Sequence, residues 1–105
     1  MQKKIQRVVS LGEALSHPLR LKLICMLADR EWYVYELAKE LDVSRQVLYL
    51  HLKRLEKADI VESDLRLEED DMRAKKFFKL KEFDVKLDVK DLKNIFETET
   101  IPKKN

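Results

Sequence analysis

The spacing of apolar residues changes once along this chain, and that change constrains the fold more than any other feature of the sequence. Up to Lys57, apolar residues recur every three or four positions, as on one face of a helix. From Ile60 onward they begin to alternate with polar residues, as in a half-buried strand. The 105 residues suffice for one domain with a modest core. We therefore predict a mainly helical α+β domain over residues 1–105, with helices first and a β-hairpin after them.

Two helices are predicted before residue 30. Apolar spacing places the first over residues 4–15. The second is capped by Ser16 or His17, has Pro18 in its first turn, where proline is tolerated, and runs to Asp29. Its apolar stripe is expected to consist of Leu21, Ile24, Cys25 and Leu27.

The next two helices are close together, as in a helix-turn-helix unit. A short helix over residues 35–41 is followed by a tight turn at Asp42 and Val43. Aspartate tolerates the left-handed conformation that such a turn requires. Ser44 is a favourable N-cap for the following helix, residues 45–57. The apolar or small residues that this unit needs are Leu37, Ala38, Leu41, Val43, Leu48 and Leu52.

The second half of the chain is predicted to hold strands and one last helix. A β-hairpin, or wing, covers residues 60–81, with a polar tip over residues 68–73 and a returning strand over residues 75–80. Strict alternation then predicts another half-buried strand. Asp88 is placed to cap a final helix. The apolar residues of that additional strand are Phe83, Val85, Leu87 and Val89.

The helix over residues 45–57 has the composition of a DNA-recognition helix. On a helical wheel three leucines face one way, with His51 beside them, while cationic and hydrogen-bonding side chains face the other way. Lysine and arginine neutralise phosphates, and glutamine, arginine and tyrosine reach base edges. A solvated amphipathic helix has a similar polar face, but the turn, the cap and the hairpin together favour recognition. The predicted DNA contacts, with three from the hairpin, are Ser44, Arg45, Gln46, Tyr49, Leu50, Lys53, Lys57, Arg73, Lys75 and Lys76.

Three motifs, in order and at matching spacing, resemble those of the ArsR family of winged-helix repressors. The first is ALSHPLRLKLI, the second is ELAKEL, and the third is the run from Ser44 through His51-Leu52 and Leu55 to Ala58, Ile60 and Val61. The match covers about two thirds of the chain. The resemblance implies a winged helix-turn-helix that binds double-stranded DNA, represses transcription and forms a homodimer through its terminal helices. Asp59 stands where the family usually has glycine, and Leu50 where relatives often have a polar residue.

The residue types required for a metal site or for catalysis are scarce. Metal-sensing relatives carry a Cys-x-Cys pair where this chain has Tyr33 and Tyr35, and no histidine follows His51. Cys25 is expected to be a buried small hydrophobe. No nucleophile is paired with a base, and no glycine-rich phosphate loop is present. We therefore predict no metal, no cofactor and no enzymatic activity.

The two ends of the chain are predicted to form a dimer interface. Both terminal helices carry apolar stripes that one small core cannot easily bury, and exposed apolar stripes usually mark interfaces. The resulting layout has dimerisation helices at residues 1–15 and 89–101, a helix-turn-helix at 35–57 and a wing at 60–81. The expected interface residues are Ile5, Val8, Val9, Leu92, Ile95 and Phe96.

Charge leaves an alternative function open. The net charge is only +2. Between Glu62 and Arg73 there are six acidic residues and two basic ones, so the phosphates of DNA should repel this segment. A winged helix that contacts another protein is therefore the alternative to one that binds DNA. No apolar run suggests a signal peptide or a membrane span, so we expect a cytoplasmic protein. The charged fraction of 40% and the single glycine suggest a thermophilic source. The effector remains unspecified.

Overall fold

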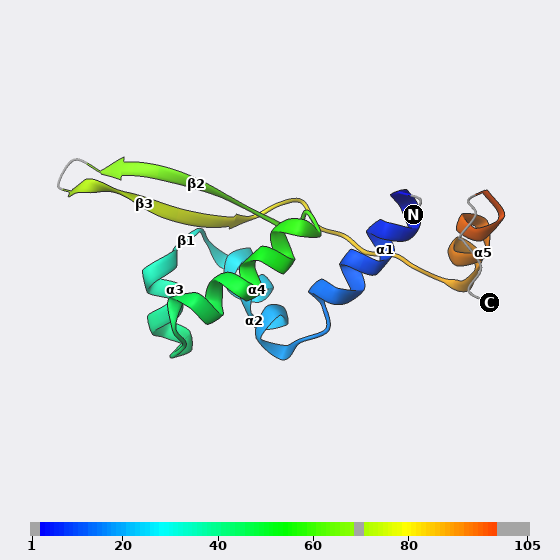
Figure 1. Ribbon diagram of the computed structural model, residues 1–105, viewed down its shortest axis with the longest axis horizontal. Coiled ribbons are helices and arrows are strands. Elements are labelled where there is room, and N and C mark those ends of the chain that lie inside the picture. Colours follow the sequence, from blue (N-terminus) through cyan, green and yellow to red (C-terminus); the bar gives the residue numbers. More distant parts are fainter. Residues whose placement is uncertain (1–2, 69–70, 99–105) are drawn as a thin grey trace.

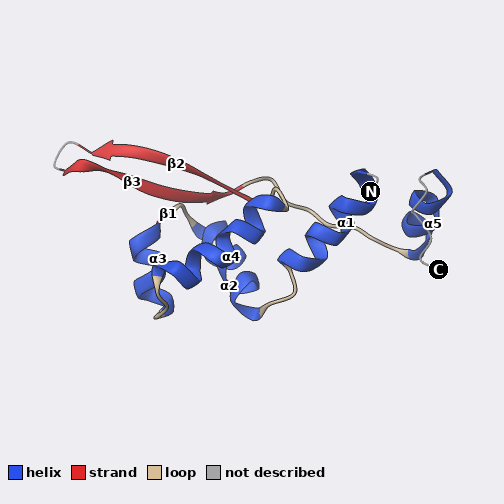
Figure 2. Ribbon diagram, in the orientation of Figure 1, coloured by secondary structure: helices blue, strands red, loops and turns tan. Residues whose placement is uncertain are grey.

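The computed structural model describes residues 3–68 and 71–98, and it confirms a mainly helical winged helix-turn-helix (Figure 1). The central helices lie below a long, twisted hairpin, and the helices at the two ends of the chain lie beyond the base of that hairpin (Figure 2). The elements in order are α1 (Lys3–Ala14), α2 (Pro18–Asp29), β1 (Trp32–Tyr33), α3 (Val34–Leu41), α4 (Arg45–Lys57), β2 (Val61–Glu68), β3 (Asp71–Leu80) and α5 (Val89–Thr98).

The core lies where α2, α3 and α4 meet the sheet. One aromatic side chain of β3, Phe78, is fully buried among leucines from the three helices. Burial of this apolar surface provides the main favourable free energy of folding for so small a domain. The most completely buried large side chains are Phe78, Leu23, Leu37, Leu48, Leu52, Leu55 and Ile60.

The turn between α3 and α4 forms as the sequence predicts. Asp42 has a left-handed backbone, with φ of 54°, and its N–H donates to the carbonyl oxygens of Ala38 and Lys39. Ser44 Oγ then accepts from the N–H of Val47 at 3.1 Å and caps α4. These bonds satisfy backbone groups that helix ends leave unpaired. The local chemistry of a few consecutive residues therefore ends α3 and begins α4.

Asp59, where related chains usually have glycine, also has a left-handed backbone, with φ of 62°. Glycine is favoured at such a position because it lacks a Cβ, and aspartate is among the few residues that tolerate it. The Asp59 carboxylate contacts Lys81 Nζ at 2.6 Å, which ties the end of α4 to the end of β3.

The hairpin lies where the sequence predicts it, but its strands reach further toward the tip than predicted. The sheet is antiparallel with order β1-β3-β2, and β3 begins at Asp71 rather than at Lys75. Glu68 pairs with Asp71 next to a register shift after Leu67. Backbone pairing holds this end together, so polar residues that resemble a loop belong to strands. The rest of the predicted tip, residues 69–70, lies outside the described residues.

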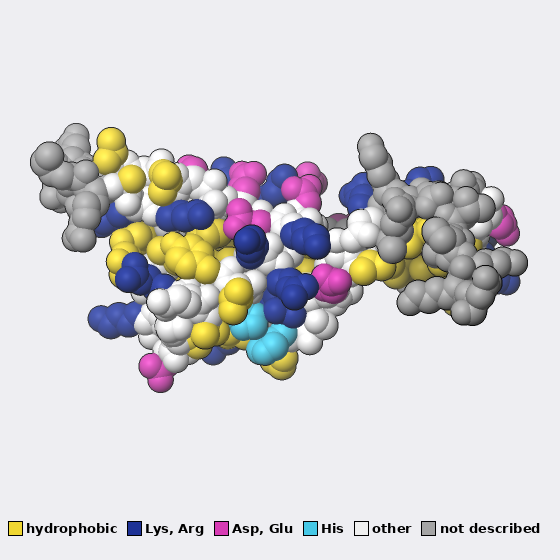
Figure 3. All heavy atoms as spheres, in the orientation of Figure 1, with side chains coloured by type: hydrophobic (Ala, Val, Ile, Leu, Met, Phe, Trp, Pro, Cys, Tyr) yellow, Lys and Arg dark blue, Asp and Glu magenta, His cyan; other side chains and the backbone are white. Residues whose placement is uncertain are grey.

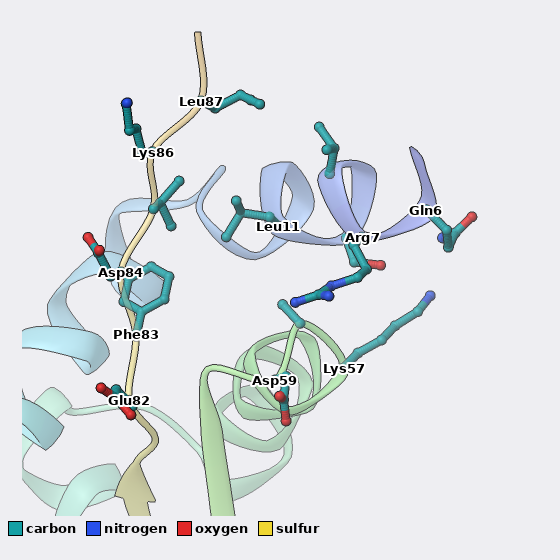
Figure 4. Close-up of a pocket in the computed structure, with 14 residues that line it drawn as sticks. Gln6, Arg7, Leu11, Lys57, Asp59, Glu82, Phe83, Asp84, Lys86 and Leu87 are labelled. Atoms are coloured by element: carbon teal, nitrogen blue, oxygen red, sulfur yellow. The ribbon is translucent and has the colours of Figure 1, made fainter. Parts of the chain in front are cut away.

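The additional strand predicted over Phe83–Val89 is wrong. Residues 81–88 are extended but form no ladder among the described residues, because the chain leaves the sheet after Leu80 and passes α1 (Figure 1). The alternation has a different cause. Phe83 and Leu87 face the α1 side of the segment, whereas Asp84 and Lys86 point away (Figure 4).

The predicted stripe of α2 is also partly wrong. Leu23 and Leu27 face the core, whereas Leu21 and Cys25 are exposed. At 100° per residue, Leu21 and Cys25 lie opposite Leu23 on the helical wheel. This helix has apolar residues on both faces, so spacing alone does not identify the buried one.

The C-terminal helix lies apart from the core. The described part of the chain extends over 57 × 28 × 24 Å, and its radius of gyration of 17.0 Å exceeds the value of about 13 Å for a compact chain of this length. Helix α5 takes part in none of the principal packing contacts. It begins with the predicted cap, since Asp88 and Asp91 each accept the other's backbone N–H at 2.8 and 3.1 Å. Leu92 and Phe96 on this helix are exposed.

Candidate nucleic-acid interface

The outer face of α4 is available to a ligand along its whole length. Leu48, Leu52 and Leu55 are each 0% exposed and anchor the helix to the core. Leu50, by contrast, is 67% exposed, which suits contact with a thymine methyl group rather than packing. The remaining predicted contacts on this helix are all exposed, namely Ser44, Arg45, Gln46, Tyr49, Lys53 and Lys57.

A row of aromatic rings connects the start of α4 to the hairpin. Arg45 at the start of α4 donates from Nη1 to the hydroxyl of Tyr35, and its Cζ lies 4.3 Å from the centre of that ring. The Tyr35 ring lies 5.1 Å from the Tyr33 ring, which in turn lies 5.6 Å from Phe77 on β3. Lys75 Nζ is 5.2 Å from the Tyr33 ring. Three aromatic rings thus follow one another from α4 to the wing, with Arg45 on the first ring and Lys75 on the second.

A second contact joins the middle of α4 to β3. Lys76 Nζ lies 5.4 Å from the rings of both Tyr49 and Phe78. Tyr49 and Lys76 therefore lie on the face of β3 that packs against α4, whereas Lys75 lies on the other face with Tyr33 and Phe77. Figure 3 shows Lys and Arg side chains around a hydrophobic patch between the hairpin and α4. Such a surface can neutralise phosphates and contact bases together.

One predicted residue on α4 lies away from this surface. Lys57, at the other end of α4, lines a cavity of about 680 Å³ between α1, the end of α4 and residues 82–87 (Figure 4). The side chain of Arg73 lies outside the described residues, as do the side chains of the acidic tip from Glu68 to Asp71.

Acidic side chains in the described part of the hairpin have basic partners. Glu62 contacts Lys79 at 3.1 Å. Arg66 contacts Asp64 at 3.3 Å and Glu31 at 2.8 Å. The hydrogen bond from Arg66 lowers the pKa of Glu31. The charges of Glu62 and Asp64 are therefore partly neutralised by these partners.

Comparison with known proteins places this geometry in a family. A family model described as a helix-turn-helix domain matches residues 15–64. An uncharacterised HTH-type transcriptional regulator of Methanocaldococcus jannaschii is 50% identical over 96 residues, which cover 91% of this chain and 99% of that protein. The crystal structure of the transcriptional repressor BigR from Xylella fastidiosa matches with a TM-score of 0.58 and 28% identity, covering 95% of this chain and 92% of BigR. A solved ArsR-family transcriptional regulator shares the fold, with a TM-score of 0.61 and 18% identity over 77% of each chain.

The chain belongs to the family of HTH-type transcriptional regulators and has the winged-helix fold of BigR and of the solved ArsR-family regulator. It is a transcriptional regulator with a DNA-binding helix-turn-helix, and α4 occupies the place of the recognition helix. No helix within residues 3–68 and 71–98 has the length and apolar character that crossing a bilayer requires. The same described residues contain no cluster of three His, Cys, Asp or Glu side chains arranged to hold a metal ion.

Behind α4, one arginine of this transcriptional regulator joins three helices. Arg20 donates to the carbonyl oxygens of Ala14 and Glu13 at the end of α1, both at 3.0 Å, and to Ser16 Oγ at 3.2 Å. Its Nη1 lies 2.8 Å from Nδ1 of His51 on α4. Arginine only donates, so Nδ1 accepts and the His51 ring is neutral. A second link, from Arg54 to Glu13 at 2.9 Å, joins α4 to α1.

The environment of His51 makes stability depend on pH. Burial, and then the neighbouring His17 and Arg20, lower the pKa of His51 below its ordinary value. The unfolded chain therefore binds more protons than the folded chain just below about pH 6.5. Stability from the neutral ring is present above that pH and is lost as the pH falls toward the folded-state pKa.

We expect His51→Gln to flatten the fall in melting temperature between pH 7.5 and 5.5. The glutamine oxygen can still accept from Arg20 but does not titrate. Thermal unfolding followed by circular dichroism measures the effect, which is a few degrees at most because the ring is partly solvated. His17→Asn, which retains a capping acceptor on α2, should keep most of the pH dependence. A wild-type curve that is flat over this range would contradict the assignment of a neutral His51.

The sequence alone does not identify Tyr33 and Tyr35 as part of this surface. By residue type they are only poor metal ligands, at positions where relatives have cysteines. Both are aromatic, two residues apart at the start of a short helix, and Tyr35 is 46% exposed. An aromatic pair just ahead of a predicted recognition helix is the signal in the sequence that could have indicated them.

Proposed function

We propose that this regulator is a homodimeric repressor that recognises an operator in double-stranded DNA with α4 and β3. The observation that carries the proposal is the continuous surface of Arg45, Tyr35, Tyr33 and Lys75, which joins the start of α4 to the wing. The N-terminal residues of a recognition helix are those that contact base edges in the major groove. Repression is supported by the similarity to BigR, a transcriptional repressor.

The homodimer is supported by the position of α5. This helix lies apart from the core and exposes Leu92 and Phe96, while Val9 is exposed on α1. Val8 and Ile95 are half-buried and Ile5 is buried within the chain. We therefore propose that Val9, Leu92 and Phe96 contribute most to the seam. A two-fold axis would place two α4 helices in successive major grooves.

We also propose the domain layout given by the sequence, namely a single domain over residues 1–105 with terminal dimerisation helices at 1–15 and 89–101. We propose that the protein is cytoplasmic and has no enzymatic activity.

Selection of bound sequences from random DNA duplexes tests the proposed function directly. We expect an inverted repeat with half-sites about one helical turn, or a multiple of it, apart. Failure to bind any duplex at low ionic strength would favour the alternative, a winged helix that contacts another protein.

The repressor is proposed to respond to no metal ion. Tyr33 and Tyr35 occupy places where metal-sensing relatives have thiolates, and both belong to the aromatic row. We expect zinc, cadmium or arsenite to leave the affinity for the selected duplex unchanged, because the ligands that would couple metal to shape are lacking. Fluorescence anisotropy with and without each ion measures this. A shift that a chelator reverses would reveal a metal site.

A further inference from the structure

We propose that Tyr35 is a positioning residue that orients Arg45 for base contact, so that sequence preference depends on a side chain outside the recognition helix. The inference rests on the proposed function, in which α4 contacts the bases. It concerns the specificity of that site rather than its overall affinity.

Arg45 is held at two points by one side chain from the preceding helix. Its Nη1 donates to the Tyr35 hydroxyl, and its Cζ lies 4.3 Å from the ring centre. The ring is in turn fixed by Tyr33 at 5.1 Å with an interplanar angle of 58°. Tyr33 belongs to β1, where it pairs with Phe77. The orientation of Arg45 therefore depends on contacts that lead to the sheet, and not only on the position of α4.

The partner of Arg45 is neutral, and that matters for its function. Among the described residues, Arg45 makes no ion pair with a carboxylate, in contrast to Arg54 and Arg66. A carboxylate would neutralise the guanidinium and would have to be displaced by DNA. A phenol ring fixes the side chain but leaves its full charge and its other N–H donors for a ligand.

Fixing this side chain favours discrimination between bases. A free arginine loses substantial rotamer entropy when it is ordered by a ligand. Paired donors in a fixed plane match the O6 and N7 acceptors of guanine, which is the commonest specific contact in the major groove. A guanidinium that is already oriented gains this contact at a lower entropic cost, whereas contact with phosphate needs little orientation.

The test measures sequence preference and salt dependence separately. The probe is the duplex recovered by the wild-type protein from a random library, together with its single-base variants. Tyr35→Leu should lower the preference for the selected base by about five-fold, the ratio that one exposed cation–π contact can supply. The decrease should occur at the base pairs where Arg45→Ala also lowers the preference. The slope of affinity against salt should stay unchanged, because the same phosphates are neutralised in both proteins. Tyr35→Phe, which keeps the ring, should show a smaller decrease in preference.

Two further comparisons complete the test. In an Arg45→Ala background, Tyr35→Leu should have no additional effect on preference, because Tyr35 acts through Arg45. Lys53→Gln is the matched control, and it should lower the salt slope by about one while leaving the order of preferred sequences intact. Thermal unfolding checks that each variant folds, which we expect since Tyr35 is 46% exposed.

The results distinguish this inference from the proposed function. A Tyr35→Leu protein that keeps the wild-type preference would overturn the positioning role alone. An effect that adds to that of Arg45→Ala would also overturn it. If the wild-type protein selects no specific duplex, the proposed function fails and the inference falls with it.

Discussion

Replacing Arg45 and Lys53 together with alanine is expected to weaken binding to the selected duplex by about 100-fold or more. A bidentate arginine–base contact alone is worth about 1–3 kcal/mol, and a phosphate contact adds to it. Both side chains are exposed on α4, so the fold should persist. The measurement is fluorescence anisotropy at several salt concentrations, and the salt slope should fall by about one for each phosphate that is no longer neutralised.

The control for this pair removes equal charge elsewhere. Lys86→Ala with Lys90→Ala changes the net charge by the same amount at exposed positions outside α4 and the hairpin. That protein should bind nearly as the wild type does. Wild-type affinity and salt slope in the Arg45 and Lys53 variant would exclude α4 from the DNA interface and favour the protein-contact alternative.

Phe96→Glu is expected to convert the proposed homodimer into a monomer. Phe96 is 54% exposed in the single chain, so a carboxylate there costs little in an isolated subunit. In an apolar seam the same carboxylate would be buried without a partner, which is prohibitive. Sedimentation at micromolar concentration should show the change, and affinity for a two-half-site duplex should fall sharply because each monomer engages one half-site.

Phe96 is a better position for this test than Val8 or Ile95, which are half-buried in their own chain. A charge at either of those two positions would disturb folding of the subunit as well as its assembly. The matched control is Lys90→Glu, which also adds negative charge to α5 but on the face opposite Leu92 and Phe96. It should remain dimeric. A wild-type protein that sediments as a monomer would defeat the proposed assembly.

Features encoded by neighbouring residues can be predicted from the sequence. The cap at Ser44, the left-handed turn at Asp42 and the cap at Asp88 form as expected. Each depends on the chemistry of a few consecutive residues. The wheel of α4 is also correct, because its three leucines define a single apolar face.

Features that depend on a distant partner cannot be predicted in the same way. Alternation at Phe83 and Leu87 indicates a strand, but a strand needs a neighbour and the sheet ends before that segment. Cys25 is exposed although burial was expected, because α2 is apolar on both faces. The contact of Arg45 with Tyr35 joins residues ten positions apart, and only the packing of α3 against α4 brings them together.

The bonds around Arg20 have a mechanical consequence. One guanidinium joins the end of α1 to α4, and the contact of Arg54 with Glu13 adds a second attachment. Because such bonds weaken steeply when distance or angle changes, we expect α1 and α4 to move together. In a two-fold assembly built on the terminal helices, the contacts between the two subunits would then determine the distance between their α4 helices. Such an assembly tolerates few changes in the number of base pairs between half-sites.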